Sequence, residues 1–89
     1  MNLTFTPRGW DDYLHWQTTE PDMVEKINAL LRDIRRDPFR GLGKPEPLKN
    51  DFAGWWSRRI TAEHRLVYRV TGKGDEQRVE IAQCRYHYS

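Results

Sequence analysis

The chain of 89 residues contains a single cysteine, Cys84, and no long apolar run. One cysteine cannot form an internal disulfide, so the composition gives no sign of an oxidising compartment. No stretch approaches the roughly 20 apolar residues that a membrane-spanning helix needs, and no signal-peptide pattern is visible. We therefore expect a cytoplasmic protein without a membrane partner.

Several signatures of catalysis are also missing. The sequence has no glycine-rich phosphate loop that ends in lysine, no GxSxG and no paired cysteine and histidine spacing. Its three histidines and one cysteine do not follow the pattern of a zinc site, and no carboxylate cluster is present to hold magnesium. We expect neither a metal nor another cofactor.

Size and charge set limits on what the chain can be. Residues 1–89 are expected to form one domain with a single compact core. The net charge of +2 conceals an asymmetry, because residues 1–30 carry −3 and residues 31–89 carry +5. A basic half is typical of a surface that binds a polyanion, although a solvated surface of mixed charge explains it equally well.

Two helices are predicted in the first half of the chain. Thr6-Pro7 is typical of a helix start, and this helix should run to about Thr18. A second start signal at residues 19–22 precedes an apolar stripe with three-to-four spacing. Residues 37–38, Asp-Pro, should end the second helix, because the residue before proline avoids the helical region.

Strands are predicted on both sides of the helices, at residues 3–5, 55–61, 65–71 and 78–88. Residues 38–47, rich in proline and glycine, are expected to form an ordered loop. This order predicts an α+β fold, with two N-terminal helices packed on one face of an antiparallel-rich β-sheet.

The faces of the strand that begins at Arg65 follow from its alternation. Leu66, Tyr68 and Val70 should pack on the helices. Arg65, Val67 and Arg69 should form an open, basic face on the other side of the sheet.

The end of the last predicted strand, Cys84-Arg85-Tyr86-His87-Tyr88, brings together groups suited to acid–base chemistry. Residues two apart in a strand point to the same side, so Arg85 and His87 should share one face. Imidazole and phenol groups act as acids or bases and can bind a nucleotide.

One carboxylate and a set of cations accompany this end. Glu46 lies in the proline-rich loop, and the cations are Lys44, Lys49, Arg58, Arg59, Arg65, Arg69 and Arg85. These groups suit metal-free RNA cleavage, in which the ribose 2′-hydroxyl is the nucleophile. A base removes its proton, cations stabilise the charged phosphorane, and an acid protonates the leaving 5′-oxygen.

Five blocks across nearly the whole chain resemble one family. They are WDDYL at 10–14, GKPEPLK at 43–49, WSRRI at 56–60, EHRLVY at 63–68 and CRYHY at 84–88. In this order they are similar to the YoeB (Txe/YoeB) toxins of bacterial type II toxin–antitoxin systems, within the RelE superfamily. The resemblance implies a microbial-ribonuclease-like, RelE-like fold. It also implies cleavage of mRNA in the A site of the 70S ribosome, which inhibits translation, and neutralisation by a YefM-type antitoxin.

The resemblance also implies a role for individual residues. It assigns the general base to Glu46, the phosphate-stabilising arginine to Arg65, the general acid to His87 and a substrate-contacting tyrosine to Tyr88. RNA or phosphate binding falls on Lys49, with Arg59 and Lys44 as further candidates.

Two other functions remain open on the sequence alone. A ParE-like toxin, which binds DNA gyrase without cleaving RNA, would not need Glu46, His87 and Tyr88 together. A catalytically inactive RNA-binding or repressor subunit would need none of them. His15 and His64 are interpreted as structural or surface residues. Self-association into a homodimer is expected to involve Trp10 and the other exposed aromatics of the first helix.

Overall fold

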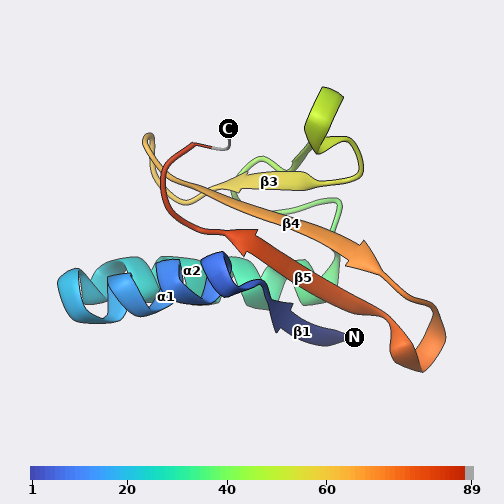
Figure 1. Cartoon of the computed structure of the whole chain (residues 1–89), viewed down its shortest axis with the longest axis horizontal. Coiled ribbons are helices and arrows are strands. Elements are labelled where there is room, and N and C mark those ends of the chain that lie inside the picture. The colour runs from blue at the N-terminus through green and yellow to red at the C-terminus, as the bar shows by residue number, and fades with distance from the viewer. Residues whose placement is uncertain (88–89) are drawn as a thin grey trace.

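The structure is a computed structural model that describes residues 1–87. Its elements are β1 (Asn2–Phe5), α1 (Pro7–Thr19), α2 (Pro21–Arg36), β2 (Glu46–Pro47), β3 (Trp56–Arg59), β4 (Arg65–Thr71) and β5 (Arg78–Gln83), with short 3-10 turns at Asn50–Phe52 and Gly74–Glu76. The strands form one sheet in the order β1-β5-β4-β3-β2. β1 pairs with β5 in parallel, and the other pairs are antiparallel. Both helices pack on one side of the sheet (Figure 1), so the predicted α+β fold is confirmed.

Local signals in the sequence determine where the helices begin and end. The Thr6 hydroxyl accepts a hydrogen bond from the Gly9 N–H at 3.0 Å, and Pro7 occupies the first turn of α1. α2 begins at Pro21 and ends one residue before Asp37. Both helices are therefore confirmed, and neither is long and apolar enough to cross a membrane.

The core lies between the helices and the sheet. Gly9 allows α1 to lie directly on β5, since a Cβ atom there would be 2.4 Å from the Ile81 carbonyl oxygen. Leu66 and Tyr68 are fully buried against the helices, and Val70 packs against the same core. The predicted helix-facing side of β4 is confirmed.

The opposite side of β4 is less open than predicted. Val67 is fully buried, so this face is not exposed along its whole length. The Arg69 guanidinium lies over the Trp55 ring at 4.5 Å and pairs with Glu80 at 2.8 Å. Only parts of this side of β4 are therefore exposed to solvent, and the prediction of an open basic face holds only for those parts.

The strand ends show the main differences from the sequence-based expectation. Residues 46–47, predicted as loop, form β2, and β3 covers only part of the predicted 55–61 strand. β5 ends at Gln83, so the prediction that the strand continues to residue 88 is wrong. Tyr86 has a φ of 63°, a left-handed conformation that strand residues do not adopt. The predicted alternation of Arg85 and His87 on one strand face is therefore also wrong.

Candidate active site

The sheet face turned away from the helices collects several of the predicted site residues. Glu46 pairs with Ser57, and Ser57 pairs with Val67, and partners across strands share a face. Arg59 and Arg65 pair with each other two residues further along β3 and β4, so they lie on that same face. Strands lie about 4.8 Å apart, which puts β2 about 10 Å from β4, a gap that long side chains and a phosphate can bridge.

Glu46 is placed by a loop fixed to β3. The Arg59 N–H donates to the Gly43 carbonyl oxygen at 2.6 Å. Gly43 has a φ of +76°, and a Cβ atom there would lie 2.8 Å from the Arg59 carbonyl oxygen, so this contact requires glycine. Glu46 and Lys49 are both exposed and line one pocket of about 250 Å³.

The other predicted phosphate-binding residues differ in solvent exposure and in the hydrogen bonds that they form. Lys44 and Arg59 are exposed. Arg65 is partly buried, and its Nη1 donates to the carbonyl oxygens of Thr61 at 2.8 Å and of Ala62 and His64 at 3.2 Å. The Arg65 guanidinium is thus anchored to the β3–β4 loop at the edge of the shared face.

Arg58 does not belong to this group of available cations. It points to the helix side and is fully buried. Its guanidinium pairs with the Asp33 carboxylate and donates to the Tyr68 hydroxyl at 3.1 Å. It also donates to three main-chain carbonyl oxygens, those of Asp37, Arg40 and Leu42. Arg58 is therefore a structural residue.

Asp33 has strong donors around its carboxylate. The Leu42 N–H donates to it at 2.9 Å, and the guanidinium groups of Arg58 and Arg36 add further bonds. These groups, led by the Leu42 N–H, lower the pKa of Asp33 from 3.8 to about 2. The carboxylate therefore stays ionised and ties the 38–42 loop to α2.

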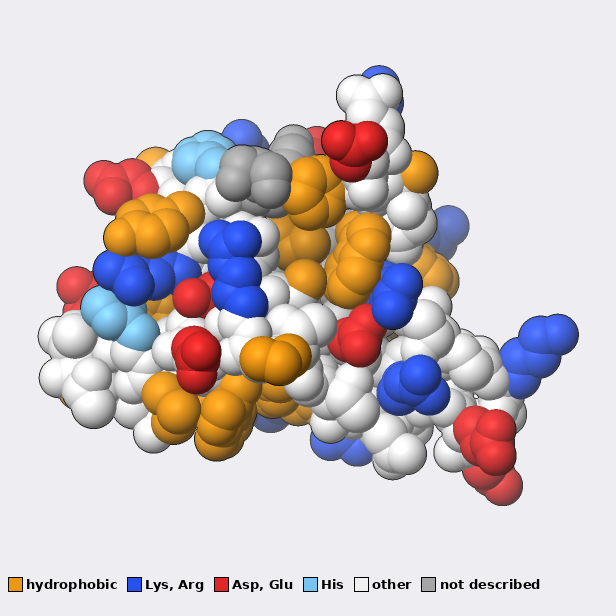
Figure 2. Space-filling model, viewed as in Figure 1, with side chains coloured by type: hydrophobic (Ala, Val, Ile, Leu, Met, Phe, Trp, Pro, Cys, Tyr) orange, Lys and Arg blue, Asp and Glu red, His pale blue; other side chains and the backbone are white. Residues whose placement is uncertain are grey.

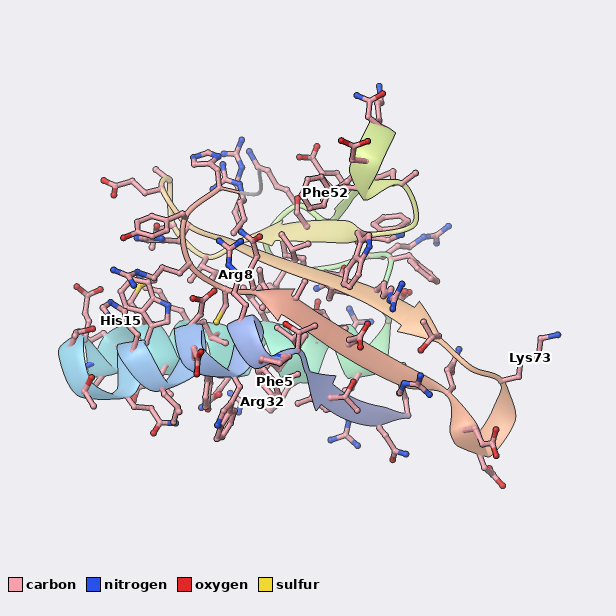
Figure 3. All side chains as sticks on the ribbon, viewed as in Figure 1. Phe5, Arg8, His15, Arg32, Phe52 and Lys73 are labelled. Atoms are coloured by element: carbon pink, nitrogen blue, oxygen red, sulfur yellow. The ribbon has the colours of Figure 1, made fainter. Side chains whose placement is uncertain are left out.

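The segment after β5, residues 84–87, is held by α1. Asp12 accepts a hydrogen bond from the Cys84 N–H at 3.0 Å, and the Trp16 indole donates to the Cys84 carbonyl oxygen at 2.9 Å. Figure 3 shows Arg8 extending from the first turn of α1 toward this segment, and its Nε lies 3.9 Å from Asp12. Burial and Asp12 raise the pKa of Cys84 to about 12, so the thiol stays protonated. Cys84 is a buried core residue.

A β-bulge then turns the segment toward the candidate site. Val67 pairs with Gln83 and Tyr68 pairs with Ile81, which leaves Ala82 as an extra residue in β5. The bulge reverses the alternation, so Gln83 faces the side of Val67 and not that of the core.

The Gln83 side chain binds the segment from this position. Its Nε2 donates to the carbonyl oxygens of Arg85 at 3.4 Å and His87 at 3.1 Å. Beyond β5 the chain turns away from the helices and passes the end of β4 toward β3 (Figure 1). His87 is exposed beside the face that carries Arg65, and Tyr88 lies outside the described residues.

Asp12, Trp16 and Gln83 support the site, and the sequence alone did not assign them this role. Gln83 stands where the alternation of Val79 and Ile81 predicts another apolar residue, which was a readable signal. Asp12 carried no comparable signal. Within residues 1–87, no three histidine, cysteine or acidic side chains lie close enough together to hold a metal ion.

Charge on the molecular surface is mixed. Figure 2 shows lysine and arginine side chains interspersed with acidic ones on the face in view, without one continuous basic patch. Hydrophobic side chains gather over α1, where Trp10 is 46% exposed.

A protein-family model described as a YoeB-like toxin of bacterial type II toxin–antitoxin systems matches residues 5–88. The chain belongs to this family. Toxin YoeB of Escherichia coli strain K12 is 57% identical over 88 residues, covering 99% of this chain and 100% of that protein. The family resemblance read from the five sequence blocks is confirmed.

Solved structures of YoeB-family toxins share this fold. The YoeB/ParE toxin from Agrobacterium tumefaciens is 65% identical with a TM-score of 0.95, covering 99% of this chain and 100% of that one. A YoeB–YefM complex from Staphylococcus aureus is 47% identical with a TM-score of 0.85, and a YoeB dimer from that organism is 46% identical with a TM-score of 0.84. Each covers 99% of this chain and 98% of the matched one.

More distant toxins show that the fold is RelE-like. The RelBE2 toxin–antitoxin complex of Mycobacterium tuberculosis matches with a TM-score of 0.71 at 23% identity, covering 97% of this chain and 96% of that one. At this identity the match concerns the fold alone.

Proposed function

We propose that this YoeB-family toxin is a ribosome-dependent mRNA endoribonuclease that cleaves mRNA in the A site and thereby inhibits translation. The observation that supports the proposal is the shared face of the sheet. Glu46 of β2 and Arg65 of β4 lie on it, and Gln83 holds the segment that bears His87 beside it. A base, an anion-stabilising group and an acid are the three components that cleavage through the 2′-hydroxyl needs.

The proposed reaction proceeds without a metal ion. Glu46 takes the proton of the ribose 2′-hydroxyl, and the 2′-oxygen attacks the adjacent phosphorus. Arg65 stabilises the negative charge that develops on the phosphorane. His87 donates a proton to the 5′-oxygen as its bond to phosphorus breaks, which leaves a 2′,3′-cyclic phosphate and a 5′-hydroxyl.

The remaining predicted residues would bind substrate. Lys49 lines the same pocket as Glu46, a position suited to holding an RNA phosphate near the base. Lys44 lies two residues before Glu46, and Arg59 lies on β3, the strand that pairs with β2. Both are exposed and would bind the RNA backbone on either side of the scissile phosphate. Tyr88 is proposed to contact the substrate next to His87.

The experiment that tests this proposal is primer extension on mRNA held by programmed 70S ribosomes, with free mRNA as the control. We expect cuts within the A-site codon on ribosomes, little cleavage of free mRNA, and full activity in EDTA. Absence of ribosome-dependent cuts would contradict the proposal. In that case inhibition of gyrase supercoiling by the purified chain would favour the gyrase-binding alternative.

An antitoxin of the YefM type is the proposed regulatory partner, supported by the YoeB–YefM complex of the Staphylococcus aureus relative. An acidic, partly disordered segment could fold across the shared face and cover residues 84–87. Steering by the +5 half, residues 31–89, would make association sensitive to salt.

The cleavage assay also tests the antitoxin proposal. Co-purification with the product of the adjacent open reading frame should give a complex that no longer cuts ribosome-bound mRNA. Full activity of a saturated complex would contradict it.

Self-association is a further proposal, supported by the dimer of the Staphylococcus aureus relative. Trp10 and Leu14 are 46% and 39% exposed on α1, and the rings of Phe5, Trp10 and Tyr13 lie within 6 Å of one another. Light scattering should show a dimer that Trp10→Ser weakens. A dimer of unchanged stability would exclude this surface.

A further inference from the structure

Tyr86 adopts an uncommon backbone conformation immediately before the proposed acid. Its φ of 63° lies in the left-handed region, which a bulky residue adopts only when its surroundings enforce it. A rotation at Tyr86 would redirect His87, the next residue in the chain. The groups that hold Tyr86 therefore control where the His87 imidazole is placed.

Two neighbouring residues hold the main chain of Tyr86. Its N–H donates to Nδ1 of His64 at 2.7 Å, and its carbonyl oxygen accepts from the N–H of Arg65 at 3.0 Å. The bond to Arg65 uses main-chain atoms, so any residue except proline at that position could make it. The bond to His64 depends on a side chain, and it is the shorter of the two.

The His64 ring is itself fixed between the core and residues 84–87. It lies edge-on to Trp16, with ring centroids 4.8 Å apart, and 5.7 Å from the Tyr86 ring. Trp16 is only 6% exposed, and its indole holds the carbonyl oxygen of Cys84. His64 thus links a buried core residue to the turn that precedes His87.

We propose that His64 is a positioning residue for RNA cleavage: neutral, with its lone pair on Nδ1, it fixes Tyr86 in the left-handed conformation and so directs His87 to the shared face. The inference rests on the proposed function for its catalytic consequence. It assigns no contact with substrate to His64. It requires Nδ1 of His64 to be a hydrogen-bond acceptor. In this tautomer of the imidazole the ring proton is on Nε2.

Two substitutions of His64 distinguish the effect of losing the hydrogen-bond acceptor at Nδ1 from the effect of losing the aromatic ring. The side-chain oxygen of asparagine can take the place of Nδ1, whereas the amide of the longer glutamine corresponds to Nε2. His64→Asn should therefore retain the bond to the Tyr86 N–H, and His64→Gln should lose it. His15→Gln is the matched control, because the His15 ring also contacts Trp16, with ring centroids 4.9 Å apart, and its side chain forms no hydrogen bond with residues 84–87. Figure 3 labels His15 on α1.

The first measurement is cleavage of ribosome-bound mRNA by the full chain, with kcat and KM determined separately. We expect His64→Gln to lower kcat roughly 10- to 100-fold while KM stays close to the wild-type value, because the acid is misplaced and substrate binding is not. His64→Asn should recover most of kcat, and His15→Gln should match the wild type. Equal kcat values for wild type, His64→Gln and His64→Asn would overturn the inference.

The second measurement is amide hydrogen exchange by NMR, which does not depend on activity. The Tyr86 amide should be protected in the wild type and in His64→Asn, and should exchange rapidly in His64→Gln. The Cys84 amide, bonded to Asp12, should stay protected in all of them. A Tyr86 amide that exchanges rapidly in the wild type would overturn the inference. So would loss of Cys84 protection in His64→Gln, because His64 would then support the fold as a whole.

The two measurements distinguish the inference from the proposed function. A wild-type chain that leaves ribosome-bound mRNA intact refutes the proposed function. If the Tyr86 amide is still protected through His64 in that chain, the role of His64 in fixing the turn is retained and only its catalytic consequence is lost.

Discussion

Arg58 and Arg59 are neighbours in β3, yet their guanidinium groups have opposite surroundings. Arg58 is fully buried on the helix side, where Asp33, Tyr68 and three carbonyl oxygens satisfy it. Arg59 is exposed on the other side, on the face that carries Glu46 and Arg65. Since side chains alternate along a strand, one step in sequence moves a cation from the core to the candidate active site.

The buried arginine of this pair contributes to the stability of the fold, and the exposed one is available for function. A buried cation must be paired, and removing its partner is costly because the charge remains in a medium that solvates it poorly. An exposed cation contributes little to folding and remains available to a phosphate. Substitutions on the helix side should therefore change the free energy of unfolding, and those on the shared face should change the rate of cleavage.

The largest effect is expected on the shared face. Glu46→Gln and His87→Gln should each lower the rate of ribosome-dependent cleavage by about 10²- to 10⁴-fold, the usual contribution of a general base or acid. Their urea-unfolding midpoints should match that of the wild type, because both residues are exposed. Cleavage at the wild-type rate by both variants would exclude the proposed base and acid.

On the helix side, Asp33→Ala should lower the free energy of unfolding by about 3–5 kcal/mol, because Arg58 would remain buried without its carboxylate. Asp75→Ala, in the exposed β4–β5 connection, is the control and should have little effect. Equal unfolding free energies for the two variants, measured in urea, would show that the Tyr68 hydroxyl and the three carbonyl oxygens satisfy Arg58 without Asp33.

The same carboxylate should make the stability depend on acid pH. The pKa of Asp33 is lowered in the folded chain from 3.8 to about 2, so its contribution is present above about pH 4. That contribution should be lost as the pH falls toward 2. Asp33→Asn should therefore flatten the dependence of the unfolding free energy on pH between 4 and 2. An unchanged slope would show that other carboxylates cause the acid sensitivity.

Substitution of Arg65 tests whether the planar shape of the guanidinium matters for cleavage, in addition to its charge. Arg65→Lys keeps the charge but replaces a planar fork with a point charge. We expect kcat to fall by about 10- to 100-fold, with a smaller change in stability from the lost bonds to the β3–β4 loop. Wild-type turnover by this variant would make Arg65 a dispensable surface cation.

The smallest effect is expected at Arg69, whose environment is intermediate. Its partner Glu80 lies 2.8 Å away, and the two side chains are 43% and 25% exposed. Glu80→Gln should lower the free energy of unfolding by only about 0.2–1 kcal/mol, as for other solvent-exposed ion pairs. A decrease in the free energy of unfolding as large as that for Asp33→Ala would contradict the view that ion pairs on the helix side stabilise the fold more than those on the shared face.

The sequence was informative where structure depends on neighbouring residues. The Thr6 cap, the proline at each helix start and the apolar stripe of α2 are local signals, and both helices follow them. The alternation in β4 likewise predicted that Leu66 and Tyr68 face the core. The family blocks supplied the fold type and the list of candidate site residues.

The path of residues 84–87 could not be predicted in the same way. An alternating Arg-Tyr-His-Tyr pattern favours a strand, but the partners that bend the chain are distant in sequence. Asp12 and Trp16 bind Cys84 across about 70 positions, and His64 binds Tyr86 across 22. The roles of Glu46, His87 and Tyr88 remain predictions.

The side chains of four residues form hydrogen bonds with residues 84–87, and each of these bonds ends on a main-chain atom of that segment. Asp12, Trp16, His64 and Gln83 bind N–H and carbonyl groups that every residue except proline provides. The path of the segment is therefore specified from outside it. Natural variation or directed evolution can therefore change the Arg85 and Tyr86 side chains while these main-chain hydrogen bonds are kept.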